Sequence, residues 1–125
     1  MIVNGIVDIN GIEIFPTDDL TEILKKTIHL KKSIRNDNNL QMLYFEDVLI
    51  CKKFTNISLV FSEVGKLRQI LMGFSMYDEK SYTIEIFNKF FYENKISNPF
   101  FFEKGKGELI YEPHFKEYTI KITYN

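Results

Sequence analysis

Apolar and polar residues alternate in short stretches along most of the chain, and the first of these stretches predicts a β-hairpin. It runs from Val7 to Ile14 and has Asn10-Gly11 at its centre. Asn-Gly is a strong hairpin signal, because a type I′ turn needs positive φ at both central residues. The predicted register pairs Ile9 with Ile12 and places all four apolar side chains of the stretch on one face.

The other face of this predicted hairpin places Asp8 directly opposite Glu13. Like charges that face each other across a ladder are mildly destabilising. Two interpretations remain open for the pair, a solvated outer face or an acidic contact point for a partner.

A helix is predicted to follow Pro16-Thr17-Asp18-Asp19. Thr17 or Asp18 can cap it, and Asp19 with Glu22 has the spacing of a capping box. The apolar positions have helical period, with Thr27 on the same stripe: Leu20, Ile23, Leu24 and Ile28.

The opposite side of the helix and the residues after it hold a basic cluster, consisting of Lys25, Lys26, His29, Lys32 and Arg35. A solvated face is the preferred interpretation, since cations are favourable near a helix C-terminus. Nucleic-acid binding through Lys25, Lys26, Lys32 and Arg35 is the less favoured alternative. A formal net charge of −1 and a chain with Arg only at positions 35 and 68 weaken the case for a polyanion ligand.

The chain beyond the Asn36–Asn39 turn changes to strand-like period. Four successive strands are predicted, with turns too short for parallel connections, and they form an antiparallel meander: residues 40–45, 48–54, 57–62 and 66–74. Residues 48–50 are apolar on both sides, as in a central strand. The cations in 66–71 are typical of a strand nearer an edge.

Residues 77–95 have mixed periodicity, so that 81–94 fit either a helix or a strand, and their length favours a helix that Asp78 or Ser81 could cap. Asn98-Pro99 ends it, and Gly105-Lys106-Gly107 is predicted to be a mobile turn. A C-terminal hairpin then pairs 108–111 with 118–124 across Pro113-His114.

These elements predict an α+β fold over a single domain, residues 1–125: a mainly antiparallel sheet with an N-terminal hairpin, a central four-strand meander and a C-terminal hairpin, on which about two helices pack. No apolar run is long enough for a membrane span, and the N-terminus lacks the pattern of a secretory signal. We therefore expect a cytoplasmic protein with no membrane association.

Catalytic residue types are sparse and scattered along the chain. It has one cysteine, Cys51, and two histidines, His29 and His114, far apart in the sequence. Cys51 lies in an apolar stretch, where a buried structural thiol is expected. This spacing predicts neither a nucleophilic site nor a metal site, and we expect no enzymatic activity and no cofactor.

Aromatic residues are abundant, with 12 Phe and 7 Tyr, which is more than one small core readily holds. Some of them are expected to be partly exposed and to serve as binding anchors: Tyr77, Tyr82, Phe100, Phe101, Phe102 and Tyr111. The alternative is that they only fill the core of a chain without Ala or Trp.

Residues 5–75 resemble small bacterial immunity proteins of contact-dependent growth inhibition and related polymorphic toxin systems. The resemblance lies in the hairpin Ile9-Asn10-Gly11-Ile12, then Pro16-Thr17 and a helix, and in a meander where Leu59-Val60-Phe61 turns through Gly65-Lys66-Leu67 into Arg68-Gln69-Ile70.

The resemblance implies a non-enzymatic protein that binds a cognate toxin domain, often a nuclease, and blocks its active site. Carboxylates presented to a basic cleft, with aromatic anchors, would form the interface. The candidate residues are Asp8, Glu13, Glu46, Asp47, Asp78, Glu79, Tyr77 and Phe101. The alternative function is a small adaptor or subunit that docks another protein through a sheet edge or the Phe100–Phe102 segment.

Overall fold

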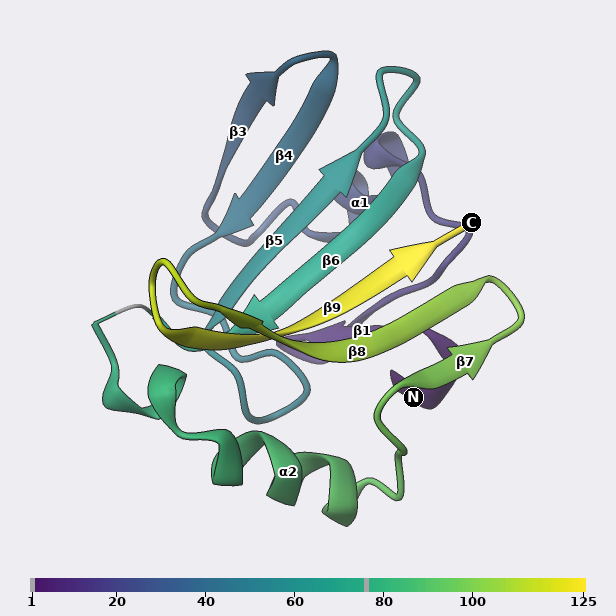
Figure 1. Ribbon diagram of the computed structural model, residues 1–125. Helices are drawn as coiled ribbons and strands as arrows, with labels where there is room; N and C mark the ends of the chain where they lie inside the picture. Colours follow the sequence, from purple (N-terminus) through teal and green to yellow (C-terminus); the bar gives the residue numbers. More distant parts are fainter. Residues whose placement is uncertain (1, 76) are drawn as a thin grey trace.

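The computed structural model describes residues 2–75 and 77–125, which form an α+β fold with antiparallel sheets, as predicted (Figure 1). The elements of these residues, in chain order, are η1 (Ile2–Asn4), β1 (Val7–Ile9), β2 (Ile12–Ile14), α1 (Leu20–Lys26), β3 (Lys32–Asp37), β4 (Leu40–Phe45), β5 (Asn56–Phe61), β6 (Leu67–Gly73), η2 (Glu79–Tyr82), α2 (Ile84–Glu93), β7 (Phe100–Phe102), β8 (Gly105–Glu112) and β9 (Glu117–Tyr124).

The main sheet has seven strands in the order β3-β4-β5-β6-β9-β8-β7, within the described residues. Strands β3 to β6 form a meander of four neighbours, and the C-terminal strand β9 then pairs with β6. The strand that begins near Lys66 is therefore central. Its predicted place near an edge is wrong, because the C-terminal hairpin covers its free side.

The register places alternate residues of every strand on opposite faces of this sheet. One row across all seven strands points to the covered face: Ile34, Leu43, Leu59, Ile70, Ile122, Gly107 and Phe100. The next row points to the other face: Arg35, Met42, Val60, Gln69, Thr123, Lys106 and Phe101. Most of the first row is fully buried, so the core lies on that side.

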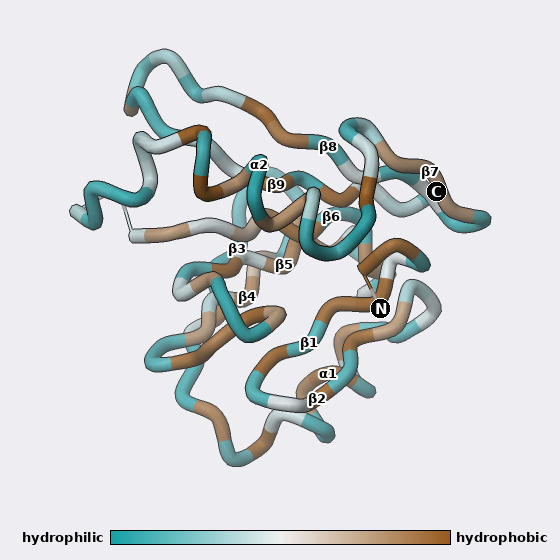
Figure 2. The backbone as a smooth tube through the Cα atoms, turned by 90° about the horizontal axis from the view of Figure 1, so that it is seen from below, coloured by the Kyte–Doolittle hydropathy of each residue, from teal (hydrophilic) through white to brown (hydrophobic). Residues whose placement is uncertain are grey.

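The covered face carries the N-terminal hairpin, α1, the loop between β4 and β5, and α2. In Figure 1, α1 and β1 lie behind the sheet and α2 runs below it, so that among the described elements no helix crosses the face toward the viewer. Figure 2, which views the molecule from below, shows α2 between β8 and the N-terminal hairpin. One face of the sheet is thus packed against other elements, and the opposite face is open.

The N-terminal hairpin has the predicted register. Val7 pairs with Ile14, Asp8 with Glu13, and Ile9 with Ile12. Asn10 and Gly11 have φ of 51° and 86°, as a type I′ turn requires. The pair Asp8–Glu13 therefore exists as predicted.

Helix α1 begins at the predicted capping box but is shorter than its apolar pattern indicates. Asp19 is the N-cap; its side chain accepts from the Glu22 backbone N–H, and the Glu22 side chain accepts from that of Asp19. The helix ends at Lys26, so Ile28 lies beyond it and is 69% exposed. Its predicted place on the buried stripe is wrong, whereas Thr27 is fully buried.

The sequence does not predict strand β3, because the residues after α1 have the pattern of a basic helix end followed by a four-residue turn. Only Asn38 and Asn39 form the turn, with φ of 47° and 69°. Positive φ at two successive residues joins β3 and β4 as a two-residue hairpin.

The predicted strand over residues 48–54 is wrong. This segment is a loop with single bridges from Ile50 to Ile9 and to Phe54. Asp47, Cys51 and Lys52 have φ of 56°, 52° and 59°, and such left-handed residues break a strand. Val48, Ile50 and Phe54 are nevertheless buried, so the apolar pattern reports a loop that packs into the core.

The ambiguous segment is helical, as its length indicates. Helix α2 follows the short η2 turn and buries Phe87, Phe90 and Phe91, while its polar residues are exposed. The ring of Phe54 contacts those of Phe87 and Phe90 at centroid distances of 5.5 and 4.8 Å. Aromatic contacts thus attach α2 to the loop before β5.

The C-terminal hairpin is confirmed as β8 paired with β9, but it is longer than predicted. Gly105 and Gly107 lie in β8 and not in a mobile turn, because Phe102 pairs with Gly105 and Phe100 with Gly107. The hydroxyl of Tyr124 donates to the carbonyl of Gly5 at 2.7 Å. Burial raises the pKa of this hydroxyl above its ordinary value, so it remains protonated as a donor.

Among the described residues, none of the helices has both the length and the apolar character that crossing a membrane requires.

Candidate binding site beside the N-terminal hairpin

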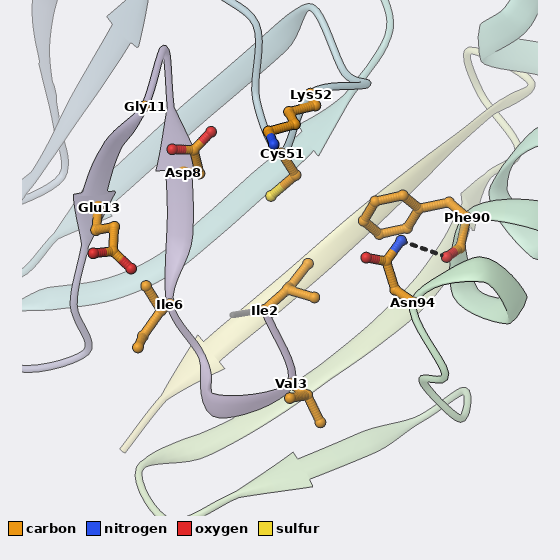
Figure 3. Close-up of a pocket in the computed structure, with 10 residues that line it drawn as sticks. All are labelled: Ile2, Val3, Ile6, Asp8, Gly11, Glu13, Cys51, Lys52, Phe90 and Asn94. Atoms are coloured by element: carbon orange, nitrogen blue, oxygen red, sulfur yellow. Dashed lines mark hydrogen bonds between the residues drawn. The ribbon is translucent and has the colours of Figure 1, made fainter.

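A hollow of about 400 Å³ lies between the N-terminal hairpin, the loop before β5 and the end of α2 (Figure 3). Its lining residues come from all three elements and from the first turn of the chain: Ile2, Val3, Ile6, Asp8, Gly11, Glu13, Cys51, Lys52, Phe90 and Asn94. Two of the predicted interface residues, Asp8 and Glu13, belong to this lining. The hollow is therefore a concave surface that includes one of the acidic pairs predicted from the sequence.

Hydrogen bonds hold the loop before β5 against the hairpin. The Asn10 backbone N–H donates to the carbonyl of Leu49 at 2.9 Å, and the Leu49 N–H donates to Asn10 Oδ1 at 2.7 Å. The Cys51 N–H donates to the carbonyl of Asp8 at 2.8 Å. These hydrogen bonds satisfy backbone groups of a loop that belongs to no β-ladder, and they fix one wall of the hollow.

The hairpin is fixed to α1 through Lys26, whose ammonium bonds the hairpin backbone and also forms a partly buried ion pair. Lys26 Nζ lies 2.6 Å from Asp18 Oδ2, and the Asp18 carboxylate is 7% exposed. The same ammonium donates to the carbonyl of Glu13 at 2.9 Å and lies 4.9 Å from the centre of the Phe15 ring. Since the Glu13 backbone is held in this way, the hairpin presents its outer face at a defined angle.

The outer face of the hairpin shows two carboxylates side by side. Asp8 is half-buried, Glu13 is exposed, and their Cα atoms are paired across the ladder. Beside them Lys52 is exposed, while Ile2 and Phe90 are buried. The site thus combines acidic groups at the rim with an apolar floor.

The thiol of Cys51 lies in this hollow but is a poor nucleophile. Figure 3 shows its sulfur directed toward the space between the hairpin and α2. Burial raises the pKa of the thiol, and the nearby charge of Asp8 raises it further, against a lowering effect of the Asp8 backbone hydrogen bond. Neither His29 nor His114 belongs to the lining of the hollow. The prediction of Cys51 in mid-strand is wrong, since it is half-buried in a turn.

The structure places the second predicted acidic pair on the loop that is tied to the hairpin. Glu46 and Asp47 are both exposed. Glu46 Oε2 lies 3.6 Å from Lys31 Nζ, a contact between side chains that are 55% and 74% exposed. Such an exposed pair stabilises little, so the Glu46 carboxylate is accessible to a partner.

The third acidic pair lies elsewhere, at the start of η2. Asp78 caps this turn by accepting the Lys80 backbone N–H at 3.0 Å, and Glu79 is exposed on its first turn. Capping chemistry accounts for Asp78. The eight predicted interface residues therefore do not form one surface.

The two aromatic candidates occupy two further places. Tyr77 is 92% exposed in the connection before η2, and Phe101 is 71% exposed on β7, on the open face of the sheet. Tyr82 and Tyr111 are each 49% exposed. Phe100, by contrast, is only 3% exposed and packs in the core, so its predicted partial exposure is wrong.

The basic cluster is divided among intramolecular contacts. Lys26 pairs with Asp18, and Lys32 Nζ donates to the carbonyls of Thr27 and Leu30 at 2.6 and 2.7 Å. The guanidinium carbon of Arg35 lies 5.5 Å from the centre of the Tyr44 ring. Lys25 and His29 are exposed, as a solvated face requires. Lys26 and Lys32, however, make contacts within the molecule and Arg35 packs on β4, so the preferred interpretation holds only for part of the cluster.

Several lining residues of the hollow carry no signal in the sequence. Cys51 and Lys52 reach it through left-handed turn geometry that is usually assigned to Gly or Asn. Ile2 and Ile6 precede the predicted hairpin, where an apolar terminal segment is the one hint of a buried anchor. In residues 2–75 and 77–125, no group of three or more His, Cys, Asp or Glu side chains is arranged to hold a metal ion.

No protein-family model matches the chain, and the searches of curated proteins and of solved structures gave no significant match either.

Proposed function

We propose that this protein is an immunity protein that binds a cognate toxin domain, such as a nuclease, and neutralises it by occluding its active site. The observation that carries the proposal is the pair Asp8 and Glu13 at the rim of the hollow. Two carboxylates at a fixed spacing are a suitable counterpart for a cleft that binds phosphate groups, because the cations of such a cleft attract paired negative charges.

The cost of the pair supports a role in binding. Like charges that lie directly opposite each other destabilise a β-ladder. Between Asp8 and Glu13 the unfavourable contact would be relieved by a cationic partner. The apolar floor formed by Ile2 and Phe90 would accept an anchoring side chain from that partner, as the centre of a protein interface does.

The loop that begins with Glu46 and Asp47 extends the acidic surface. Its Leu49 is hydrogen-bonded to the hairpin turn at Asn10 on both backbone groups. Pre-organised charges are effective in recognition, because little conformational freedom is lost when the partner binds. We place the toxin-binding surface on the hairpin and this loop, and not on Asp78 and Glu79.

Co-expression with the product of the gene immediately upstream tests the function. We expect the full chain to form a one-to-one complex with that product and to abolish its toxicity to the producing cells. The proposal would be contradicted if the upstream product still inhibited growth in the presence of an equal amount of this protein and no complex were found on co-purification.

A further inference from the structure

One of the two outermost strands of the main sheet, β3, has an open edge. It pairs with β4 on one side, and among the described residues no strand pairs with its other side. Lys32 is half-buried and the other five residues of β3 are exposed. An unpaired edge of six residues is a template for another strand.

The direction of the β3 backbone groups follows from one hydrogen bond. The Glu46 N–H donates to the Lys31 carbonyl at 3.0 Å, so the backbone of Lys31 faces the β4 side. Because successive residues of a strand alternate, the N–H and C=O groups of Lys32, Ile34 and Asn36 point away from the sheet. These are the groups that an added strand would bond.

We propose that two copies of this chain associate through β3, in an antiparallel pairing whose two-fold axis passes through Ile34. In this register Ile34 faces Ile34 of the second copy, and the outward backbone of Lys32 meets that of Asn36. On the open face, Lys31 lies opposite Asp37 of the second copy, and by symmetry this contact occurs twice. Charge complementarity therefore supports a second copy as the occupant.

Neighbouring registers are less favourable. An axis at Ser33 places Lys31 against Arg35 of the second copy, and an axis at Arg35 opposes two guanidinium groups. An axis at Asn36 requires pairing of Asn38, whose φ of 47° is incompatible with a strand. The Ile34 register is the one that joins opposite charges along the full strand.

The side chains of β3 leave the edge accessible on both faces. The ammonium of Lys32 is turned to the carbonyls of Thr27 and Leu30 and does not project from the edge. Ile34 is 52% exposed and would be covered by its counterpart. Lys31 is held only by the exposed pair with Glu46 at 3.6 Å, and it can turn to Asp37 of the second copy at little cost.

Sedimentation velocity of the full chain over a concentration series tests the association. One pair of short strands is a small interface, so we expect a weak dimer in rapid exchange. Asp37→Lys should raise the dissociation constant about tenfold, because two symmetric contacts become repulsive. The double variant Lys31→Asp with Asp37→Lys should restore it, and Glu103→Lys, the same kind of charge change at an exposed residue of the turn between β7 and β8, should leave it unchanged.

Two results of that series would overturn the proposal. A monomer at every concentration, up to several hundred micromolar, would exclude the association. Dimerisation that is unaffected by Asp37→Lys, or that the double variant does not recover, would exclude this interface.

Disulfide trapping tests the register itself. In a Cys51→Ser background, Ile34→Cys should form a cross-linked dimer on mild oxidation, because paired residues of this kind have Cα atoms about 5.5 Å apart, within disulfide range. Arg35→Cys is the matched control and should cross-link poorly. Cross-linking at position 35 and not at 34 would disprove the Ile34 axis. The dimer contacts lie on β3, whereas the proposed toxin-binding surface lies on the β1–β2 hairpin and the loop from Glu46, and the two surfaces meet at the Lys31–Glu46 pair.

Discussion

At the scale of single residues, the partly buried pair of Asp18 and Lys26 matters most for the proposed binding site. The Asp18 carboxylate accepts from Lys26 Nζ at 2.6 Å and from the Phe15 N–H at 2.9 Å. The sequence indicates Asp18 only as a possible helix cap, and it places Lys26 on a solvated face. Neither periodicity nor spacing shows that these two side chains meet, because their contact depends on how the segment between β2 and α1 turns back on the helix.

Replacing Lys26 tests that role. Lys26→Met keeps the aliphatic length but leaves the Asp18 carboxylate, which is 7% exposed, without its cation. We expect a loss of about 2 kcal/mol in the free energy of unfolding by urea. Lys25→Met, at an exposed position of the same helix, should change it by less than about 0.5 kcal/mol. Equal effects of the two substitutions would show that the ion pair contributes nothing specific.

The cross-strand pair Glu112–Glu117 predicts a pH-dependent effect. Burial raises the pKa of the Glu117 carboxyl from 4.5, and the charge of Glu112 raises it further. The folded state therefore holds the proton more tightly than the unfolded state, and stability falls as the pH rises from below 4.5 through the raised folded pKa. Above that pKa the penalty is complete, and at low pH it is absent.

Glu117→Gln should consequently stabilise the protein by a few tenths of a kcal/mol at neutral pH and not at a pH well below 4.5. Urea unfolding of both proteins at the two pH values measures the difference. A gain of the same size at both values would assign the effect to packing and not to titration.

At the scale of elements, the sequence predicts those segments whose local pattern and turn chemistry agree. The hairpin around Asn10-Gly11 and the capping box at Asp19 are of this kind, and both are confirmed. Strand β3 has Ile34 as its one large apolar residue, so alternation gives no signal there. Residues 48–54 have the signal of a strand, but three left-handed residues in and beside them convert the segment to a packed loop.

The attachment of β7 to β8 provides a test at this scale. A Cβ at Gly107 would lie 2.1 Å from the Phe100 ring, which is 3% exposed. Gly107→Ala should therefore cost about 1–3 kcal/mol in unfolding free energy. A smaller side chain at position 100 relieves this clash. The double variant Gly107→Ala with Phe100→Leu should therefore regain part of the lost unfolding free energy.

Gly105→Ala is the matched control in the same strand. Its Cβ would lie 1.9 Å from the backbone carbonyl oxygen of Thr123, which a side-chain change at Phe100 does not move. Phe100→Leu should not rescue it. Rescue of both glycine substitutions, or of neither, would contradict the packing described for β7.

At the scale of the whole molecule, the sheet order explains what the sequence does not predict. Strand β6 pairs with β9, and η2, α2, β7 and β8 lie between them in the chain. No local pattern reports such a long-range pairing, and for this reason the cations of β6 indicate a strand near an edge although β6 is central. The same arrangement places Ile2 and Phe90, far apart in the sequence, in the lining of the hollow beside Asp8 and Glu13. Sequence reasoning identifies the acidic pair but not the concave surface beside it.

If this surface binds a toxin, neutralising its acidic pair should lower the affinity for the toxin without lowering the stability of the protein. Asp8→Asn with Glu13→Gln removes an unfavourable charge contact, so the variant should be at least as stable as the natural protein. Glu112→Gln with Glu117→Gln neutralises the other opposed acidic pair, at the tip of the β8–β9 hairpin, and is the matched control.

The affinity of these two variants for the upstream-encoded toxin domain, measured by isothermal titration calorimetry, tests the central claim most directly. We predict that the Asp8/Glu13 variant binds at least about tenfold more weakly, because each close charge pair at an interface contributes on the order of 1.5 kcal/mol or more. The Glu112/Glu117 variant should bind like the natural protein. Undiminished affinity of the Asp8/Glu13 variant, or an equal loss in both, would contradict the assignment of the hairpin as the toxin-binding surface.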